Sequence, residues 1–348
     1  MLTLVARQII IMLISNLLLL NLVDAQSSSE SNNKKEWTFL IFLNADNNLD
    51  QFGVGDVEEM MQVGSTDQFN MVVQLDRSEG EPCNRLFINK GSYDIVEAMG
   101  ECDMGSAGVL TDFVEWGAQN YPAKKYAVVI WNHGSGWSKK RGNNIFKGIS
   151  YDDESGNHIT TAQLTPAVAK MQESLGQKVD ILAFDACLMQ MLEVSYAVKD
   201  HVDIMLASED IEPGEGWAYY ESMAPIAANP EMGPAEVATM IVDTYDESYD
   251  GGSQGNRATT QSWVRMSKID NLINALNEAS ATLNGNFIQE TKKAISKVQK
   301  FYYRSNIDLI HFLKILEQQI AGNTDSSLSA LKSQLLDQLS SAKTAANN

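Results

Sequence analysis

Short apolar runs alternate along this chain with segments whose apolar residues recur at helical spacing. The apolar runs, which have the length of buried strands, occupy residues 37–44, 70–75, 126–131, 179–184, 202–207 and 262–266. Helical spacing covers residues 54–63, 110–119, 161–175, 189–198 and 235–248. Ser106 and Gly176 are typical start and stop signals for the second and third of these helices. Strands that alternate with helices predict an α/β fold, with a mostly parallel sheet covered by helices on both faces.

Two stretches depart from this alternation. Residues 85–89 and 93–97 are short and alternate between apolar and polar positions, which predicts a hairpin at a sheet edge. Residues 138–157 are polar, basic at first and acidic later, and predict an exposed loop around a short strand at 148–151.

The two ends of the chain differ from its middle. Residues 1–25 predict a cleaved secretory signal peptide, because an apolar stretch follows Arg7 and small residues end the segment. A retained membrane anchor is the alternative, but the stretch is short for a spanning helix. Residues 26–35 then form a polar linker, 36–267 an α/β domain, and 268–348 a mainly helical C-terminal region that packs on it. The expected location is secreted or periplasmic, with no membrane contact after signal removal.

The composition limits the partners. The 348 residues carry a net charge of −19, with 44% apolar and 20% charged residues. This balance predicts a packed globular core, in one large α/β domain or two smaller ones. An acidic chain repels nucleic acid and anionic membranes, so neither is expected as a partner, although solubility alone also explains the acidity. We expect a monomer.

Three cysteines occur: Cys83, Cys102 and Cys187. An odd number in an exported protein points to one working thiol. Cys83 and Cys102 flank a short segment and are candidates for a disulfide worth about 3 kcal/mol. The sequence alone leaves this pairing open.

Two of the predicted strands run directly into reactive side chains. The strand at 126–131 is followed by His133 and the strand at 179–184 by Cys187, 54 positions later (187 − 133). Adjacent parallel strands release their loops at one carboxyl edge of the sheet, so the two side chains can meet there as a cysteine nucleophile and its base. A helix from Met189 would favour the thiolate. A buried structural thiol is the alternative reading of Cys187 alone.

The residues after His133 suggest a second catalytic element. Glycine lets a backbone approach a substrate closely, and the N–H of Gly134, with that of Cys187, is a candidate oxyanion hole. A phosphate-binding loop is disfavoured, because neither the dinucleotide fingerprint nor a G-K-[ST] segment is present. No spacing of His, Cys and carboxylates is typical of zinc, so neither a metal site nor a cofactor is predicted.

Asp185 lies two residues before Cys187. An ionised carboxylate at the base of a pocket there would pair with a Lys or Arg of the substrate. Capping the helix that follows is the alternative role. Asp210 and Glu212, in an irregular loop predicted over 209–220, are further candidates for the same pocket.

Four segments, Asn44-Ala-Asp-Asn-Asn-Leu49, Asn132-His-Gly-Ser-Gly-Trp137, Asp185-Ala-Cys-Leu-Met189 and Glu212-Pro-Gly-Glu-Gly-Trp217, follow one another in this order. Together they resemble the clostripain family of cysteine endopeptidases, which belongs to the caspase-like group. The resemblance extends roughly from Trp37 to Leu313. The His and Cys segments are specific as a pair and weak singly.

The resemblance implies a caspase-like fold and cleavage after basic residues, Arg above all. It assigns the base to His133, the nucleophile to Cys187 and the acid that sets basic specificity to Asp185. It also implies that a zymogen matures by self-cleavage between the His and Cys strands. We prefer the Lys147–Gly148 bond, beside the predicted short strand; the other candidates are Lys139, Lys140 and Arg141. Some relatives need calcium, but no calcium loop of recognisable spacing is present.

The sequence therefore predicts an exported cysteine endopeptidase acting on proteins or peptides with basic residues. Its reaction would use a Cys-His dyad without a fixed third member and a thioester intermediate. Two alternatives stay open: a caspase-like peptidase with Asn or Asp specificity, and a non-catalytic exported binding module.

Overall fold

The computed structural model describes residues 34–346 except 79, 138–146 and 284, with side chains up to residue 341. The expected signal peptide, most of the polar linker, and the candidate processing residues Lys139, Lys140 and Arg141 lie outside the described residues. Among the described helices, none is both long enough and apolar enough to cross a membrane.

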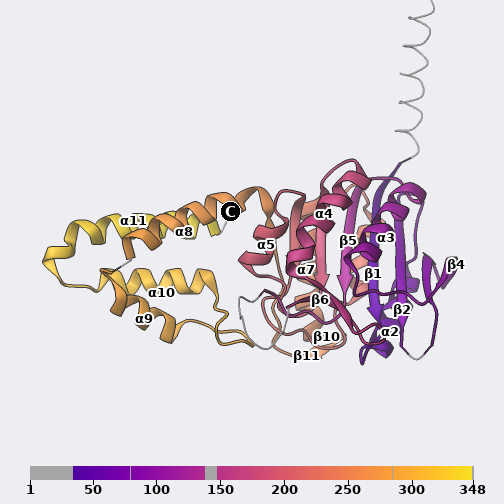
Figure 1. Cartoon of the computed structure of the whole chain (residues 1–348), viewed down its shortest axis with the longest axis horizontal. Helices are drawn as coiled ribbons and strands as arrows, with labels where there is room; N and C mark the ends of the chain where they lie inside the picture. Colours follow the sequence, from indigo (N-terminus) through magenta and orange to yellow (C-terminus); the bar gives the residue numbers. More distant parts are fainter. Residues whose placement is uncertain (1–33, 79, 138–146, 284, 347–348) are drawn as a thin grey trace, which may run out of the picture.

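A mixed sheet forms the centre of the larger part of the molecule (Figure 1). Its strands lie in the order β12-β9-β8-β5-β1-β2-β3-β4. The middle strands β9, β8, β5, β1 and β2 are parallel, and antiparallel strands flank them at both edges. The bounds are β1 Lys35–Ala45, β2 Phe69–Arg77, β3 Cys83–Asn89, β4 Ser92–Gly100, β5 Ala123–Trp131, β8 Val179–Asp185, β9 Val202–Ala207 and β12 Ser262–Arg265.

Helices cover both faces of this sheet, which confirms the predicted architecture. Side chains alternate along β1, so Leu40 and Phe42 enter one apolar layer while Phe39, Ile41 and Leu43 enter the other. Burying each such side chain contributes about 1.5–3 kcal/mol. The first layer packs against α3 (Ala107–Asn120), α4 (Thr161–Leu175) and α5 (Leu192–Val198), and the second against α2 (Asp50–Val63), α6 (Tyr219–Ala228) and α7 (Pro234–Tyr249).

The helix after Cys187 begins later than predicted. Helix α5 starts at Leu192 rather than at Met189. Leu188 has a positive φ of 64°, which a helix does not accommodate. The N–H of Gln190 donates instead to the carbonyl of Ser208, 2.9 Å away. The expected helix-dipole stabilisation of a Cys187 thiolate is therefore wrong, since that effect is confined to the first turn.

The predicted short strand after the polar loop is buried and belongs to a hairpin. β6 (Gly148–Asp152) pairs with β7 (Asn157–Thr160), and the sequence pattern missed the second strand. Hydrogen bonds compensate the polar residues of β6, as Ser150 Oγ accepts from Asn44 Nδ2 (3.1 Å) and donates to the carbonyl of Met104 (2.8 Å). The short strands β10 (Asp250–Gly252) and β11 (Gly255–Asn256) form a further small hairpin.

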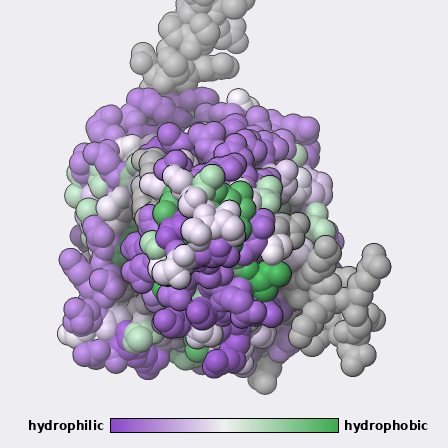
Figure 2. Space-filling model, turned by 90° about the vertical axis from the view of Figure 1, so that its left-hand side faces the viewer, coloured by the Kyte–Doolittle hydropathy of each residue, from purple (hydrophilic) through white to green (hydrophobic). Residues whose placement is uncertain are grey.

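The C-terminal region forms a helical arm that extends away from the sheet (Figure 1). It has an apolar core of its own, which includes Phe287, Leu313, Leu316 and Leu335. Viewed from the end of the arm, the surface is largely hydrophilic (Figure 2). The arm comprises η1 Met266–Lys268, α8 Ile269–Leu283, α9 Ile288–Lys297, α10 Leu309–Ala321, η2 Ser326–Leu328 and α11 Ser329–Ala346.

Cys83 and Cys102 form a disulfide, with their Cα atoms 5.8 Å apart. The bond ties the start of the edge hairpin β3–β4 to the loop that leaves it. Cys187 is the free cysteine of the described residues.

Candidate active site

The loops that carry His133 and Cys187 leave the sheet side by side. Strands β5 and β8 are neighbours, and Trp131 pairs with Asp185 at their carboxyl ends. Each reactive residue follows two positions later in its own chain segment. The loops are in close contact, because a methyl group on Gly134 would lie 2.4 Å from the carbonyl oxygen of Cys187. The parallel register of two strands thus brings the candidate base and nucleophile to one edge.

His133 is oriented by a residue for which the sequence suggested no role. Its Nε2 lies 2.7 Å from Oδ1 of Asn48, in the loop after β1. An amide oxygen can only accept, so Nε2 carries the ring proton and Nδ1 keeps the lone pair that a base needs. Burial lowers the pKa of His133, against the opposing charge of Asp153, so the imidazole is neutral at rest. The expected dyad without a fixed third member stays a prediction, to which this contact adds a residue that positions the imidazole.

The Cys187 thiol is half-buried and receives a backbone donor. The N–H of Glu212 lies 3.3 Å from Sγ, which stabilises the sulfur when it is charged. Burial nevertheless raises the pKa of Cys187, so the resting group is the thiol. The left-handed backbone of Leu188, rare for a non-glycine residue, turns the chain immediately after the thiol.

The candidate oxyanion donors face the same loops. The N–H groups of Ser135 and Leu188 donate to the carbonyls of Gly148 (2.9 Å) and Asp210 (3.0 Å). In the part of the chain that the structure describes, no such loop hydrogen bond uses the N–H of Gly134 or Cys187. The role of these two N–H groups as oxyanion donors stays a prediction.

Asp185 is buried near the thiol, where its charge acts on Cys187. Its carboxylate is 4% exposed and accepts from the N–H of Trp217 at 3.3 Å. Gly216, at a φ of 56°, brings its backbone so close that a methyl group there would lie 2.8 Å from Oδ1 of Asp185. Burial raises the pKa of Asp185 to about 7. The alternative role as a helix cap is wrong, since Met191 occupies the N-cap position of α5.

Further acids surround this carboxyl group. Burial and the charge of Asp185 hold the pKa of Glu212 well above its usual range. Asp56 lies on the other side, where Trp131 Nε1 donates to it at 2.7 Å, and burial raises its pKa well above normal. These acids therefore cannot all ionise together without a positive partner, and a cation among them would be strongly favoured.

Unused polar atoms also line this region. Trp217 Nε1 and the hydroxyl of Tyr245 are buried and have no hydrogen-bond partner among the described residues. Buried polar atoms normally have partners, and ones without often mark ligand or water positions. None of Asn48, Asp56, Tyr219 or Tyr245 was predicted as a site residue, because each lies far in sequence from both reactive residues.

Asp210 has a different environment from Asp185. Its Oδ1 accepts from the N–H of Ile211 (2.9 Å) and from that of Tyr302 (2.8 Å), a residue of the return loop between α9 and α10. Asp210 thus joins the site loop to the helical arm. Its predicted role in substrate binding stays a prediction.

The preferred processing bond is held by the site loops. The carbonyl of Lys147 accepts from the N–H of Thr161 (3.3 Å), and the N–H of Gly148 donates to Ser135 Oγ (3.0 Å). The Lys147 ammonium lies 3.4 Å from the centroid of the Tyr303 ring, again in the return loop of the arm.

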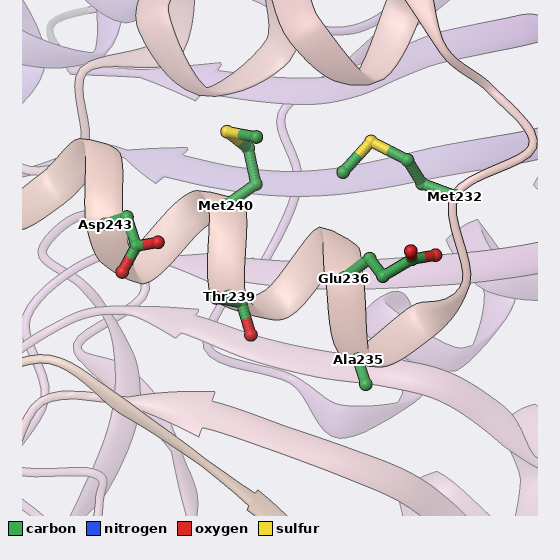
Figure 3. A pocket seen from close by; sticks show the side chains of 6 residues that line it. All are labelled: Met232, Ala235, Glu236, Thr239, Met240 and Asp243. Carbon is green, nitrogen blue, oxygen red and sulfur yellow. The ribbon is translucent and has the colours of Figure 1, made fainter.

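A surface hollow on α7 lies away from these loops (Figure 3). Met232 lines it, and the carbonyl of Met232 accepts from Lys125 at 2.9 Å. Lys125 is near the amino end of β5, whereas His133 follows the carboxyl end of the same strand, so the hollow is at the opposite edge of the sheet.

Comparisons with known proteins agree with this architecture. The model of the clostripain family matches residues 41–347. Clostripain of Hathewaya histolytica is 29% identical over 226 residues, which are 56% of this chain and 42% of clostripain, so the chain spans less than half the length of this relative.

Two solved structures have a similar fold. One is a secreted C11 cysteine protease from Bacteroides thetaiotaomicron in complex with an irreversible peptide inhibitor, with a TM-score of 0.66, 20% identity, and coverage of 87% of this chain and 81% of that chain. The other is an inactive zymogen C11 protease from Parabacteroides distasonis, with a TM-score of 0.65, 20% identity, and coverage of 90% and 81%. The expected caspase-like α/β fold is thereby confirmed.

Proposed function

The chain belongs to the clostripain family, and from this premise we propose that it is a cysteine endopeptidase that cleaves peptide bonds after Arg or Lys. The observation that carries the proposal is the buried carboxyl pair of Asp185 and Glu212 beside the Cys187 thiol. A pair of acids next to a nucleophile selects a cationic side chain for the residue whose carbonyl is attacked.

The reaction follows from the neutral resting state. When a substrate is bound, His133 Nδ1 takes the thiol proton while Sγ of Cys187 attacks the scissile carbonyl carbon. The carbonyl oxygen becomes an oxyanion that the N–H groups of Gly134 and Cys187 stabilise. Collapse breaks the C–N bond, His133 returns the proton to the leaving amine, and a thioester stays on Cys187. Water then attacks the thioester, again with His133 as base, and regenerates the thiol.

Fluorogenic peptides that differ only in their last residue, before the reporter group, test the activity. Purified protein should turn over fluorogenic peptides ending in Arg or Lys and leave those ending in Asn or Asp intact, and Cys187→Ala should abolish turnover. Turnover of Asn or Asp peptides would instead indicate the other caspase-like specificity. If none of the four peptides is turned over, before or after limited cleavage of the protein by trypsin, the non-catalytic binding module is favoured.

The proposal includes export and self-processing at the Lys147–Gly148 bond. Both groups of this bond are hydrogen-bonded, so a cut requires local opening of the segment. N-terminal sequencing of the active protein should find a new terminus at Gly148, absent from Cys187→Ala and from Lys147→Ala but present in the exposed-lysine control Lys90→Ala. A terminus upstream of residue 147 would move the cut to another site.

A further inference from the structure

The return loop between α9 and α10 of the arm is an ordered turn. The N–H of Asn306 donates to the carbonyl of Tyr303 at 2.7 Å. Lys300 and Ile307 pair on either side of this bond as an isolated antiparallel bridge. Main-chain hydrogen bonds thus hold Tyr302 and Tyr303 in a fixed hairpin at the end of the arm that is nearest to the sheet.

This return loop is anchored to the backbone beside the Cys187 thiol. The N–H of Tyr302 donates to Oδ1 of Asp210 at 2.8 Å. The carbonyl of the same Asp210 accepts from the N–H of Leu188 at 3.0 Å, and Leu188 directly follows Cys187 in the chain. One residue therefore connects the arm to the segment that carries the candidate nucleophile, so the return loop belongs to the surroundings of the thiol.

The Tyr303 side chain is near both loops of the candidate active site. Burial raises the pKa of Tyr303, and the charges of Tyr151 and Cys187 act on it in the same direction. The Tyr151 hydroxyl is itself 2.7 Å from Oγ of Ser135, in the loop that carries His133. The Tyr303 phenol is therefore neutral, and its ring face is the part that can attract a charged group.

A cation of the chain itself lies on this ring. The Lys147 ammonium is 3.4 Å from the centroid of the Tyr303 ring. The other cation–ring pairs of the described residues are 4.6 to 5.9 Å apart, so this contact is the shortest among them. The π-system of a tyrosine carries negative charge on its face, which attracts Lys and Arg side chains. The structure thus shows a basic side chain bound beside the loops of the thiol and the imidazole.

We propose that Tyr303 forms a second cation-binding site, which holds a Lys or Arg side chain next to the basic residue that Asp185 recognises in the substrate. This subsite rests on the proposed function. The negative charge of Asp210, which acts on the Cys187 thiol, adds to the attraction of a cation at this place. The class of substrate is thereby narrowed to peptides with two neighbouring basic residues.

Lys147 and the substrate compete for the ring. While the chain is uncut, Lys147 occupies the face of Tyr303. A cut of the Lys147–Gly148 bond separates Lys147 from β6, and a substrate side chain can then replace it. The attraction comes from the ring and not from the hydroxyl, so Tyr303→Phe should keep the subsite and Tyr303→Leu should remove it.

Matched pairs of peptides test the subsite on the processed protein. In one fluorogenic pair, Arg precedes the reporter and the residue before Arg is Lys or norleucine. In a second, internally quenched pair, the residue after Arg is varied in the same way. In one of the two pairs, kcat/KM should be about fivefold higher or more for the Lys peptide.

Two variants and a control assign this preference to the ring. Tyr303→Leu should abolish it, whereas Tyr303→Phe should keep it. Tyr196→Leu is the control, because Tyr196 is another exposed tyrosine with a lysine, Lys199, over its ring at 5.2 Å. The control should show the same preference as the parent.

A binding measurement makes the test independent of turnover. In the whole chain carrying Cys187→Ala and Lys147→Ala, calorimetry should show that the Lys peptide of one pair binds about fivefold tighter than its norleucine partner. Adding Tyr303→Leu should remove this difference. Equal values for Lys and norleucine in both pairs, or a preference that survives in Tyr303→Leu, would overturn the subsite, while turnover of the Arg peptides would leave the proposed function standing. If no Arg peptide is bound or turned over, the proposed function fails and the subsite fails with it.

Discussion

Oδ1 of Asn48 and Nε2 of His133 lie 2.7 Å apart, and this contact fixes the ring nitrogen that is left to act as a base. The two residues come from neighbouring strands, β1 and β5, whose loops leave the same edge of the sheet. A polar loop that contributes no nucleophile thus sets the orientation of the candidate catalytic imidazole.

Replacing Asn48 should impair the chemical step more than substrate binding. In Asn48→Ala the ring loses its orienting acceptor, so kcat should fall about tenfold while KM stays nearly constant. Steady-state kinetics on an Arg-ended peptide measures both values. Asn120→Ala, at the exposed end of α3, is the control and should behave like the parent. An equal rise in KM with unchanged kcat would refute an orienting role.

The pocket should give substrate binding its own pH dependence. Burial raises the pKa of Asp185 to about 7, and Glu212, Asp56, Glu59, Tyr219 and Cys187 are the ionisable groups near it. An Arg side chain requires the ionised carboxylate, so KM should fall as pH rises from 6 towards 7 and level off above pH 7. Below that pH, KM should rise by up to about tenfold per unit. Asp185→Asn should bind weakly at every pH; a parallel pH dependence in this variant would contradict the assignment.

The same buried acid should make the protein without substrate less stable as pH rises from acidic to neutral. The folded pKa of Asp185 is raised above its unfolded value near 3.8, so the folded state holds a proton that the unfolded state releases. Stability is therefore lost as pH rises from about 4 to 7. Asp185→Asn should be more stable than its parent at pH 8 by on the order of 3 kcal/mol, and by much less at pH 5. Urea unfolding in a Cys187→Ala background measures this, and an equal difference at both pH values would argue against the shift.

The absence of a side chain at Gly216 should be required for normal substrate binding at Asp185. Gly216→Ala places a methyl group 2.8 Å from Asp185 Oδ1, at a φ of 56° that L-residues avoid. Gly156→Ala is a matched control, since its φ is 68° but nothing lies within 4 Å of the added carbon. Both variants should lose about 1 kcal/mol of stability from backbone strain. Only Gly216→Ala should raise KM for Arg-ended peptides, and similar kinetics for both variants would show that the close approach is unimportant.

The strand-forming runs and the residues directly after them could be predicted from the sequence. His133, Cys187 and Asp185 follow apolar strands, and a parallel register necessarily brings such positions together. The buried position of β6 could not be predicted, because its polar residues Ser150 and Asp152 are compensated by bonds to distant loops. Asn48 was missed because its contact with His133 joins residues that are 85 positions apart in the sequence.

The start of α5 shows a different limit of sequence patterns. Apolar spacing from Met189 is helical, but tertiary bonds and the left-handed Leu188 override it. Local propensity is a weak guide where a chain turns beside a reactive group.

Mass spectrometry of covalently labelled protein tests the central claim most directly. The protein would be incubated with thiol-reactive peptide ketones that end in Arg or in Asp, and the adduct mapped by peptide sequencing. The account predicts one Arg-probe adduct, on Cys187, strongly reduced in His133→Ala and in Asp185→Asn, with no Asp-probe adduct. Labelling by the Asp-ended probe, or Arg-probe labelling of Cys187 that is unaffected by Asp185→Asn, would contradict a basic-specific peptidase built on these residues.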